Sequence, residues 1–434
     1  MNVFSGSRFI TALASLVKFF ITALEKSRTG AFAASFANFL ENAFLRSKLF
    51  LVSKKMPILY PARIWGTFDR VNVGLKSSVD LFNPLFIFPL VYLAFVCIST
   101  YRPSNLAMFS IFLGVLFFGA GVKLAKRVKI KNIALESESE RIAIFLISIG
   151  VLALIYDLFQ AGAIPLLKPT AKRYLNVTLT TLAMILVPGG ILAISAIGNR
   201  LEKKLISQKD ARIYSLFILI GTTFLIALLG YRTQIIVSLL GCTIAMYYSR
   251  LIGAIEVLFS FFAALLSISI AGYYRAIAEG GSVGIFDVIG QRMGLTLSIY
   301  DSLVNRFYLF GANHGTVFLS TFSSFFHTIP GPRLGPRTIV ARMYGVQDIS
   351  MTSTLFGTVV LDFGILGIMA FALALGFVVG LAYFTMKRTK GAIATGIFSL
   401  LIAYTLVGVE TGLVDLVVFL FFFTSFLILV NPKR

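Results

Sequence analysis

Long apolar stretches separated by short polar segments make up most of the chain after residue 80. A helix that crosses the hydrocarbon layer of a bilayer needs about 20 mostly apolar residues. Ten stretches meet this requirement: 81–100, 106–124, 142–160, 176–197, 213–230, 233–249, 251–271, 358–384, 391–409 and 412–430. The pattern predicts an all-α polytopic membrane protein with about ten transmembrane helices.

The predicted spans divide the chain into four segments. Residues 1–80 are rich in basic and apolar side chains, and we expect them to form amphipathic helices in the cytoplasmic interface of the membrane. One or two further spans in this region are the alternative interpretation. Spans one to seven occupy residues 81–271, a large outer loop occupies residues 272–357, and spans eight to ten occupy residues 358–434.

The composition agrees with a membrane protein and excludes several other classes. Hydrophobic residues make up 58% of the chain and charged residues 13%, whereas soluble proteins contain about 25% charged residues. Cys97 and Cys242 both lie in apolar stretches, and no Cys/His cluster suited to zinc, haem or an iron–sulfur group occurs in the sequence. The G-x-x-x-x-G-K-[ST] motif of nucleotide hydrolysis is also absent from it. We therefore expect neither a metal nor an organic cofactor.

Lysine and arginine are distributed unequally between the two sides of the predicted spans. One side carries 28 of the 39 basic residues, including those in residues 1–80 and at the C-terminus, and the other side carries 11. Because cytoplasmic loops are enriched in these residues, both termini are predicted to face the cytoplasm of a cell membrane. We interpret the net charge of +21 as a topology signal and an attraction to anionic lipid, not as nucleic-acid binding.

The outer loop concentrates the residues that could carry chemistry. A loop of 86 residues is long, and long loops are usually functional. It contains both histidines of the chain, His314 and His327. Six of the 11 outer basic residues also lie there: Arg275, Arg292, Arg306, Arg333, Arg337 and Arg342. All six are arginines, whose planar guanidinium can bind phosphate or carboxylate through two parallel hydrogen bonds.

The two halves of this loop have different patterns. Apolar residues between Ile289 and Phe307 recur at helical spacing, which predicts an amphipathic helix on the outer leaflet. The segment 329–337 holds three prolines and two glycines, so we expect a rigid turn rather than a helix. That turn presents Arg333 and Arg337 either as phosphate ligands or as parts of an ordinary lumenal turn.

Three further residues outside the loop are candidates for the site. Arg232 lies in a four-residue turn between two spans, where it either completes an anion site or only reaches the interface. Asp157 and Asp362 lie inside spans or at their outer ends, and carboxylates at membrane depth are costly and therefore functional candidates. For Asp362, a structural pairing with an arginine is the alternative.

The chain resembles the oligosaccharide repeat-unit polymerases, or O-antigen polymerase family, in four places. These are Tyr156-Asp157 with Gly162-Ala163-Ile164-Pro165-Leu166-Leu167, Gly230-Tyr231-Arg232-Thr233, the arginine-rich loop ending in Ile329-Pro330-Gly331, and Asp362-Phe363-Gly364 with Gly367. Together they cover residues 150 to 380. Each motif is short, so the resemblance depends on their order and on their placement relative to the membrane.

The resemblance implies glycosyl transfer on the outer face of the membrane. The donor would be a polyprenyl-(pyro)phosphate-linked glycan and the acceptor another lipid-linked repeat, with a flippase and a chain-length regulator as partners. The residues fit this chemistry, because fixed arginines can stabilise a phosphate leaving group without a metal. His314, His327 or an aspartate could act as the general base for the acceptor hydroxyl.

Two other functions use the same features. A flippase for lipid-linked oligosaccharides would be expected to show internal repeats and a charged central cavity, and the sequence shows neither pattern. A ligase that transfers a finished glycan to protein or to a lipid core would share the arginines and the loop. The sequence separates this ligase poorly from a polymerase.

Overall fold

The computed structural model describes residues 80–128, 136–261, 287–326, 328–346 and 350–430. The chain divides into two compact units, 1–74 and 75–434, and all described residues belong to the second unit. The predicted N-terminal interfacial region, apart from its last residue, lies outside the described residues, as do Arg275 and His327.

In these ranges the second unit is helical, and no strand is found within them. The α-helices are α5 (Pro84–Ile98), α6 (Asn105–Ala125), α7 (Ser139–Ala161), α8 (Val177–Ala183), α9 (Leu186–Glu202), α10 (Gln208–Leu228), α11 (Arg232–Tyr248), α13 (Asp287–Phe307), α14 (Thr316–Ser323), α15 (Pro336–Met343), α16 (Gly357–Thr389), α17 (Ala392–Thr411) and α18 (Leu416–Val430). Two short 3-10 helices, η3 (Glu136–Glu138) and η4 (Pro169–Tyr174), precede α7 and α8.

Within the described ranges, six helices are long and apolar enough to cross a membrane: α6, 136–161, 177–202, α10, α16 and α17. Two more apolar helices, α5 and α18, have 15 residues each. Helix α5 starts at Pro84, after the start of the predicted span at residue 81. The Asn83 side chain caps it by accepting a hydrogen bond from the Leu85 amide, and Pro84 occupies the first helical position. The multi-pass membrane class is therefore confirmed, but the predicted count of ten is not. Residues 262–271 of the predicted span 251–271 lie outside the described residues.

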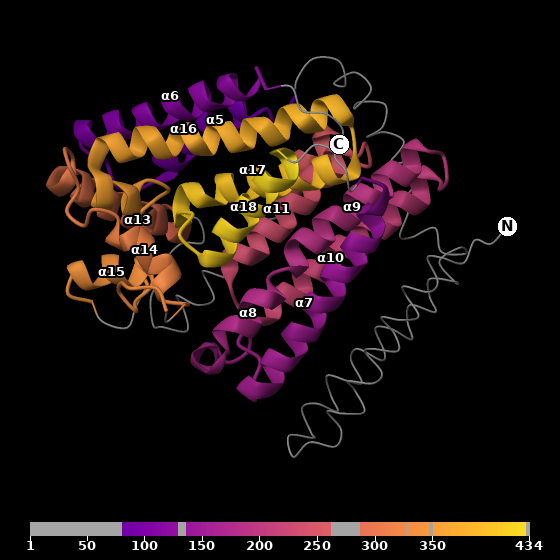
Figure 1. Cartoon of the computed structure of the whole chain (residues 1–434), viewed down its shortest axis with the longest axis horizontal. Helices are drawn as coiled ribbons and strands as arrows, with labels where there is room; N and C mark the ends of the chain where they lie inside the picture. Colours follow the sequence, from indigo (N-terminus) through magenta and orange to yellow (C-terminus); the bar gives the residue numbers. More distant parts are fainter. Residues whose placement is uncertain (1–79, 129–135, 262–286, 327, 347–349, 431–434) are drawn as a thin grey trace. The chain divides into compact units, whose positions relative to one another are not determined.

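Helices α6 and α16 lie side by side over much of their length (Figure 1). Glycines let their backbones approach closely: a Cβ at Gly121 would collide with the Leu373 carbonyl, and one at Gly376 with the Phe118 carbonyl. Such small-residue contacts are typical of helix packing in membranes, where lipid supplies no hydrophobic drive for association. This contact fixes the position of α16.

Helix α17 is the centre of the helical core. It packs against α9, α11 and α16, and its side chains are almost all buried. Helices α16 and α17 each pack against several other helices, so the turns at their ends are held in place. The turn between α17 and α18 becomes important for the site.

The predicted amphipathic helix of the loop is present as α13. Its apolar residues Leu297, Tyr300 and Val304 are fully buried, and the helix packs against α16, α6 and α5. Buried Asp301 anchors it, because its carboxylate accepts hydrogen bonds from the Tyr101 hydroxyl at 2.7 Å and the Ser104 amide at 3.1 Å. The buried face of α13 therefore packs against other helices of the protein.

The second half of the loop differs from the expected single turn. Pro336 starts helix α15, since proline is favoured in the first helical turn, where its missing amide costs no hydrogen bond. Arg337 is consequently helical, whereas Arg333 remains in the irregular segment between α14 and α15.

Candidate active site

Helix α16 is broken at Gly364, at the end that the sequence predicts to face outward. Gly364 has φ 63° and ψ −151°, a conformation essentially restricted to glycine. The break separates two groups that would pair in a regular helix, the Leu361 carbonyl and the Ile365 amide. The loop after α13 replaces that bond: the Ala312 amide donates to Leu361 at 2.8 Å, and Ile365 donates to the Tyr308 carbonyl at 2.7 Å.

Asp362 lies two residues before the break and is only 1% exposed. Its two oxygens accept hydrogen bonds from the amides of Val317 at 3.0 Å and Phe318 at 2.7 Å. These are free amides of the first turn of α14, whose N-cap residue, Gly315, has no side chain to satisfy them. The described hydrogen-bond donors to Asp362 are thus backbone amides, not the arginine considered from the sequence.

His314 immediately precedes this capped helix. Its φ of 46° is left-handed, an uncommon conformation for a residue other than glycine that often marks a functional position. The side chain is exposed and lies close enough to Asp362 for the two groups to interact electrostatically. The structure therefore brings together two of the predicted catalytic residues from positions 48 apart in the sequence.

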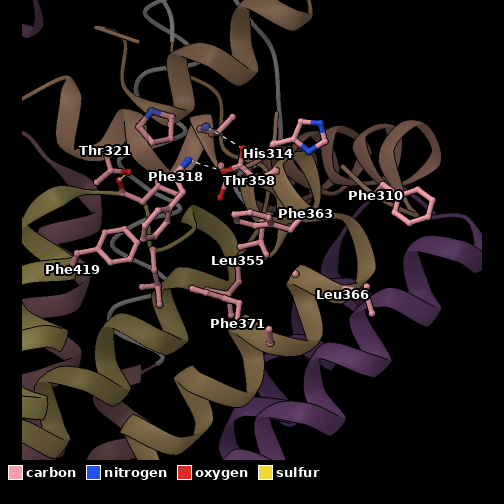
Figure 2. A pocket seen from close by; sticks show the side chains of 18 of the residues that line it. Phe310, His314, Phe318, Thr321, Leu355, Thr358, Phe363, Leu366, Phe371 and Phe419 are labelled. Atoms are coloured by element: carbon pink, nitrogen blue, oxygen red, sulfur yellow. Dashed lines mark hydrogen bonds between the residues drawn. The ribbon is translucent and has the colours of Figure 1, made fainter. Parts of the chain in front are cut away.

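A cavity of about 670 Å³ opens beside these two residues (Figure 2). Its lining is mainly apolar and comprises Leu309, Phe310, His314, Val317, Phe318, Thr321, Pro336, Leu355, Thr358, Val359, Asp362, Phe363, Leu366, Gly367, Ala370, Phe371, Leu413, Val414 and Phe419. The α16 residues among them come in pairs every four positions, so they follow one face of the helix. From Thr358 to Phe371 this face extends roughly 20 Å at 1.5 Å per residue.

Figure 2 shows how the polar groups are distributed in this cavity. Phe363 lies between His314 and Phe371, so His314 is near one end of the α16 face. The rings of Phe318 and Phe419 meet edge to face, with their centroids 5.2 Å apart. The cavity thus has a long aromatic and aliphatic wall and a short polar end.

The turn between α17 and α18 joins the loop helices to the cavity. Arg337 of α15 pairs with Asp415, with Nη2 to Oδ2 at 2.9 Å, and its Nε donates to the Thr411 carbonyl at 3.3 Å. Arg292 of α13 pairs with Glu410. Two carboxylates five residues apart near the outer end of the last predicted hairpin were a usable signal in the sequence for partners of the outer arginines.

The other predicted arginines are placed differently. The Nη1 of Arg333 donates to the carbonyls of Ser323 at 2.8 Å and Ile329 at 3.2 Å, so it binds the C-terminal end of α14 and the segment after it. Arg342 is exposed on α15, and Arg232 is the first residue of α11. Neither is among the residues that line the cavity.

Asp157 is fully buried away from the cavity. Its carboxylate accepts hydrogen bonds from the Asn176 amide at 2.8 Å and the Thr180 hydroxyl at 2.6 Å, which fixes the start of α8 against α7. Both oxygens therefore have partners within the protein. The structure thus places Asp157 apart from His314 and Asp362 in the cavity.

Sequence reasoning missed one basic residue next to Arg232. Lys172 of η4 donates to the Gly230 carbonyl at 2.6 Å and lies over the Tyr231 ring, 5.3 Å from its centroid. Burial raises the pKa of Tyr231, and the charges of Asp157 and Asp415 raise it further. Tyr231 is therefore a neutral hydroxyl at physiological pH.

The helices and the cavity define a polytopic α-helical membrane protein with a largely apolar site at a broken helix. The family model described as "Putative O-antigen polymerase" matches residues 80–422, and the chain belongs to this O-antigen polymerase family. An uncharacterised protein of Methanocaldococcus jannaschii is 31% identical over 361 residues, which cover 81% of this chain and 93% of that protein. No solved structure matches the chain.

Family membership indicates the general activity. Membership of the O-antigen polymerase family indicates a glycosyltransferase-like enzyme of membrane glycan polymerisation. It implies lipid-linked glycans as substrates and contact with membrane lipid. The resemblance to O-antigen polymerases that the sequence motifs indicated is thereby confirmed at the level of the family.

Proposed function

We propose that the chain polymerises lipid-linked oligosaccharide repeat units on the outer face of the membrane. The observation that carries the proposal is the cavity, which combines a long apolar face of α16 with His314 and Asp362 and lies next to Arg337. This combination suits a substrate that has a hydrocarbon chain at one end and an anionic, reacting group at the other.

The apolar wall supports a polyprenyl chain as the part that binds there. Its apolar part on α16, from Phe363 to Phe371, extends roughly 12 Å, which is about 40% of the hydrocarbon thickness of a bilayer. Each buried methylene-sized group would contribute about 0.8 kcal/mol. The aromatic residues Phe318, Phe363 and Phe371 belong to this wall.

Two loop arginines are proposed to stabilise the leaving group: Arg337, which directly follows Pro336 of the cavity wall in the sequence, and Arg292. In the proposed step, the acceptor hydroxyl oxygen bonds to the anomeric carbon while the bond from that carbon to the lipid (pyro)phosphate breaks. The bonding electrons leave with the phosphate, whose growing negative charge Arg337 and Arg292 would stabilise without a metal ion. Arg232, Arg275, Arg333 and Arg342 remain candidate phosphate ligands.

His314 is the general base in this scheme. It would accept the proton of the acceptor hydroxyl, and the carboxylate of Asp362 would stabilise the imidazolium that forms. Asp362 is held by two amides, so it would keep its position during the reaction. His327 remains the second candidate base, and Asp157 is proposed as a structural residue.

The test uses the full chain, purified and placed in nanodiscs with lipid-linked repeat units as the only substrate. A ladder of longer lipid-linked glycans is expected without nucleotide sugar, and it should persist in EDTA. His314→Asn should lower turnover by about 10²–10⁴ and retain lipid-linked substrate, because asparagine tolerates the left-handed backbone. His327→Asn distinguishes the two candidate bases, because only the variant that lacks the base should lose turnover.

Each alternative function predicts a different result. Movement of lipid-linked glycan across vesicles without elongation would replace the polymerase with a transporter. A single transfer of finished glycan to protein or a lipid core would replace it with a ligase. Normal ladders from His314→Asn would remove His314 from the mechanism.

A further inference from the structure

Both loop arginines nearest the α17–α18 turn already have an anionic partner. Arg337 holds Asp415, with a 2.9 Å contact, and Arg292 holds Glu410. In each pair the arginine comes from a loop helix. Glu410 lies in the last turn of α17 and Asp415 in the short turn that follows it. A phosphate that binds Arg337 must therefore share it with Asp415 or displace it.

The Arg337–Asp415 pair lies at the edge of the cavity. Pro336 and Val414 both belong to the cavity wall, and the paired residues directly follow them in the sequence. The Arg337 side chain is 22% exposed and that of Asp415 is 37% exposed. An incoming anion can therefore reach the pair from solvent.

The second contact of Arg337 explains how the arginine would keep its position during an exchange. Its Nε donates to the Thr411 carbonyl at 3.3 Å, and α15 itself carries the residue. Thr321 also donates to the Val414 carbonyl at 3.1 Å, which holds the turn against α14. Loss of the Asp415 contact would leave these two anchors in place.

We propose that Asp415 is a specificity-determining residue that competes with the anionic head of the substrate for Arg337. The proposal rests on the proposed function, in which Arg337 stabilises a lipid (pyro)phosphate. Partly exposed ion pairs are weak, so a diphosphate with several charges can displace one carboxylate. A phospholipid with a single charge gains less from the same exchange. Asp415 would thus make Arg337 selective for lipid diphosphates in a membrane that contains other anionic lipids.

The test measures binding to the full chain in phosphatidylcholine nanodiscs with two probes, farnesyl diphosphate and uncharged farnesol. Asp415→Asn removes the competing charge and retains a similar shape. It should lower the Kd for farnesyl diphosphate about fivefold, the factor that corresponds to losing one partly exposed ion pair. The Kd for farnesol should not change, because the alcohol does not need Arg337.

Two further variants make the result specific. In Arg337→Ala, adding Asp415→Asn should no longer tighten diphosphate binding, because the shared partner is gone. Asp80→Asn is the control for loss of an acidic partner: it breaks a similarly exposed pair with Lys387 at the other end of α16, where the asparagine oxygen can still accept a hydrogen bond from Tyr248 or Tyr383. It should leave the Kd of both probes unchanged.

The outcomes separate this inference from the function on which it rests. If both probes bind the wild type but Asp415→Asn binds the diphosphate no more tightly, competition by Asp415 is overturned and the lipid site stands. If neither probe binds the wild type or Asp415→Asn, the lipid site and the competition are both overturned. A tightening that persists in the Arg337→Ala background would overturn Arg337 as the shared partner.

Discussion

The break in α16 can be tested by adding one methyl group, in Gly364→Ala. The backbone there has φ 63°, and a Cβ would lie 2.6 Å from the Leu309 carbonyl oxygen and 2.7 Å from the Tyr308 carbonyl oxygen. Both are backbone atoms, so no side-chain rotation can relieve the contact. The helix and the loop after α13 would have to separate.

The expected cost follows from these contacts. A non-glycine residue in this conformation costs about 1–3 kcal/mol, and each lost hydrogen bond between the loop and the break adds about 1 kcal/mol. A total of about 3 kcal/mol would lower the apparent melting temperature by roughly 6 °C, at about 2 °C per kcal/mol for a large domain. Because His314 follows the same loop, its displacement by about 1 Å would lower turnover by about 10².

The assay combines thermal unfolding of the purified protein with measurement of glycan chain length. Gly221→Ala is the control, because this α10 glycine has open space where its Cβ would lie and a helical backbone. Alanine there should be neutral or slightly stabilising. An unchanged melting temperature and normal glycan length in Gly364→Ala would refute the structural requirement for glycine at the break.

Three other experiments test separate parts of the molecule. Asp157→Asn should lower stability by about 1–3 kcal/mol in thermal unfolding, because one of two buried donors loses its acceptor, while turnover per folded molecule stays constant. Arg333→Lys should lower stability by about 1 kcal/mol through lost carbonyl contacts; a large fall in turnover at unchanged stability would instead support phosphate binding. In a Cys97→Ser background, a cysteine in place of Arg342 should react with an impermeant thiol reagent in intact cells, and one in place of Glu202 should not. The opposite labelling would reverse the predicted topology.

The apolar pattern predicted the helical membrane class because long hydrophobic runs leave few other structures possible in lipid. It could not predict the break in α16. Gly364 lies within an apolar run that continues on both sides, and hydropathy does not register a change in backbone conformation. Only the sequence Asp362-Phe363-Gly364 marked this position, without indicating which segment fills the break.

The sequence predicted which types of residue form the site, but it did not predict which residues they pair with. A loop rich in arginine indicated anion binding, and Arg292 and Arg337 do bind anionic groups, which are carboxylates of the protein itself. Their partners lie at the end of α17 (Glu410) and just after it (Asp415), so the pairing depends on how α13 and α15 pack. Proximity of His314 to Asp362 likewise depends on the loop that enters the break, and no local pattern encodes it.

The broken helix explains how one site can serve both a lipid and a charged reacting group. An unbroken span would satisfy all its backbone bonds internally and would present only side chains to the cavity. At Gly364 the loop backbone replaces one helical bond, so the loop approaches α16 closely without leaving that pair unsatisfied. Asp362 then caps α14, and His314 is held at the start of that helix. The backbone break at Gly364 therefore positions the polar residues at one end of the cavity, and the rest of the α16 face remains apolar for the proposed lipid.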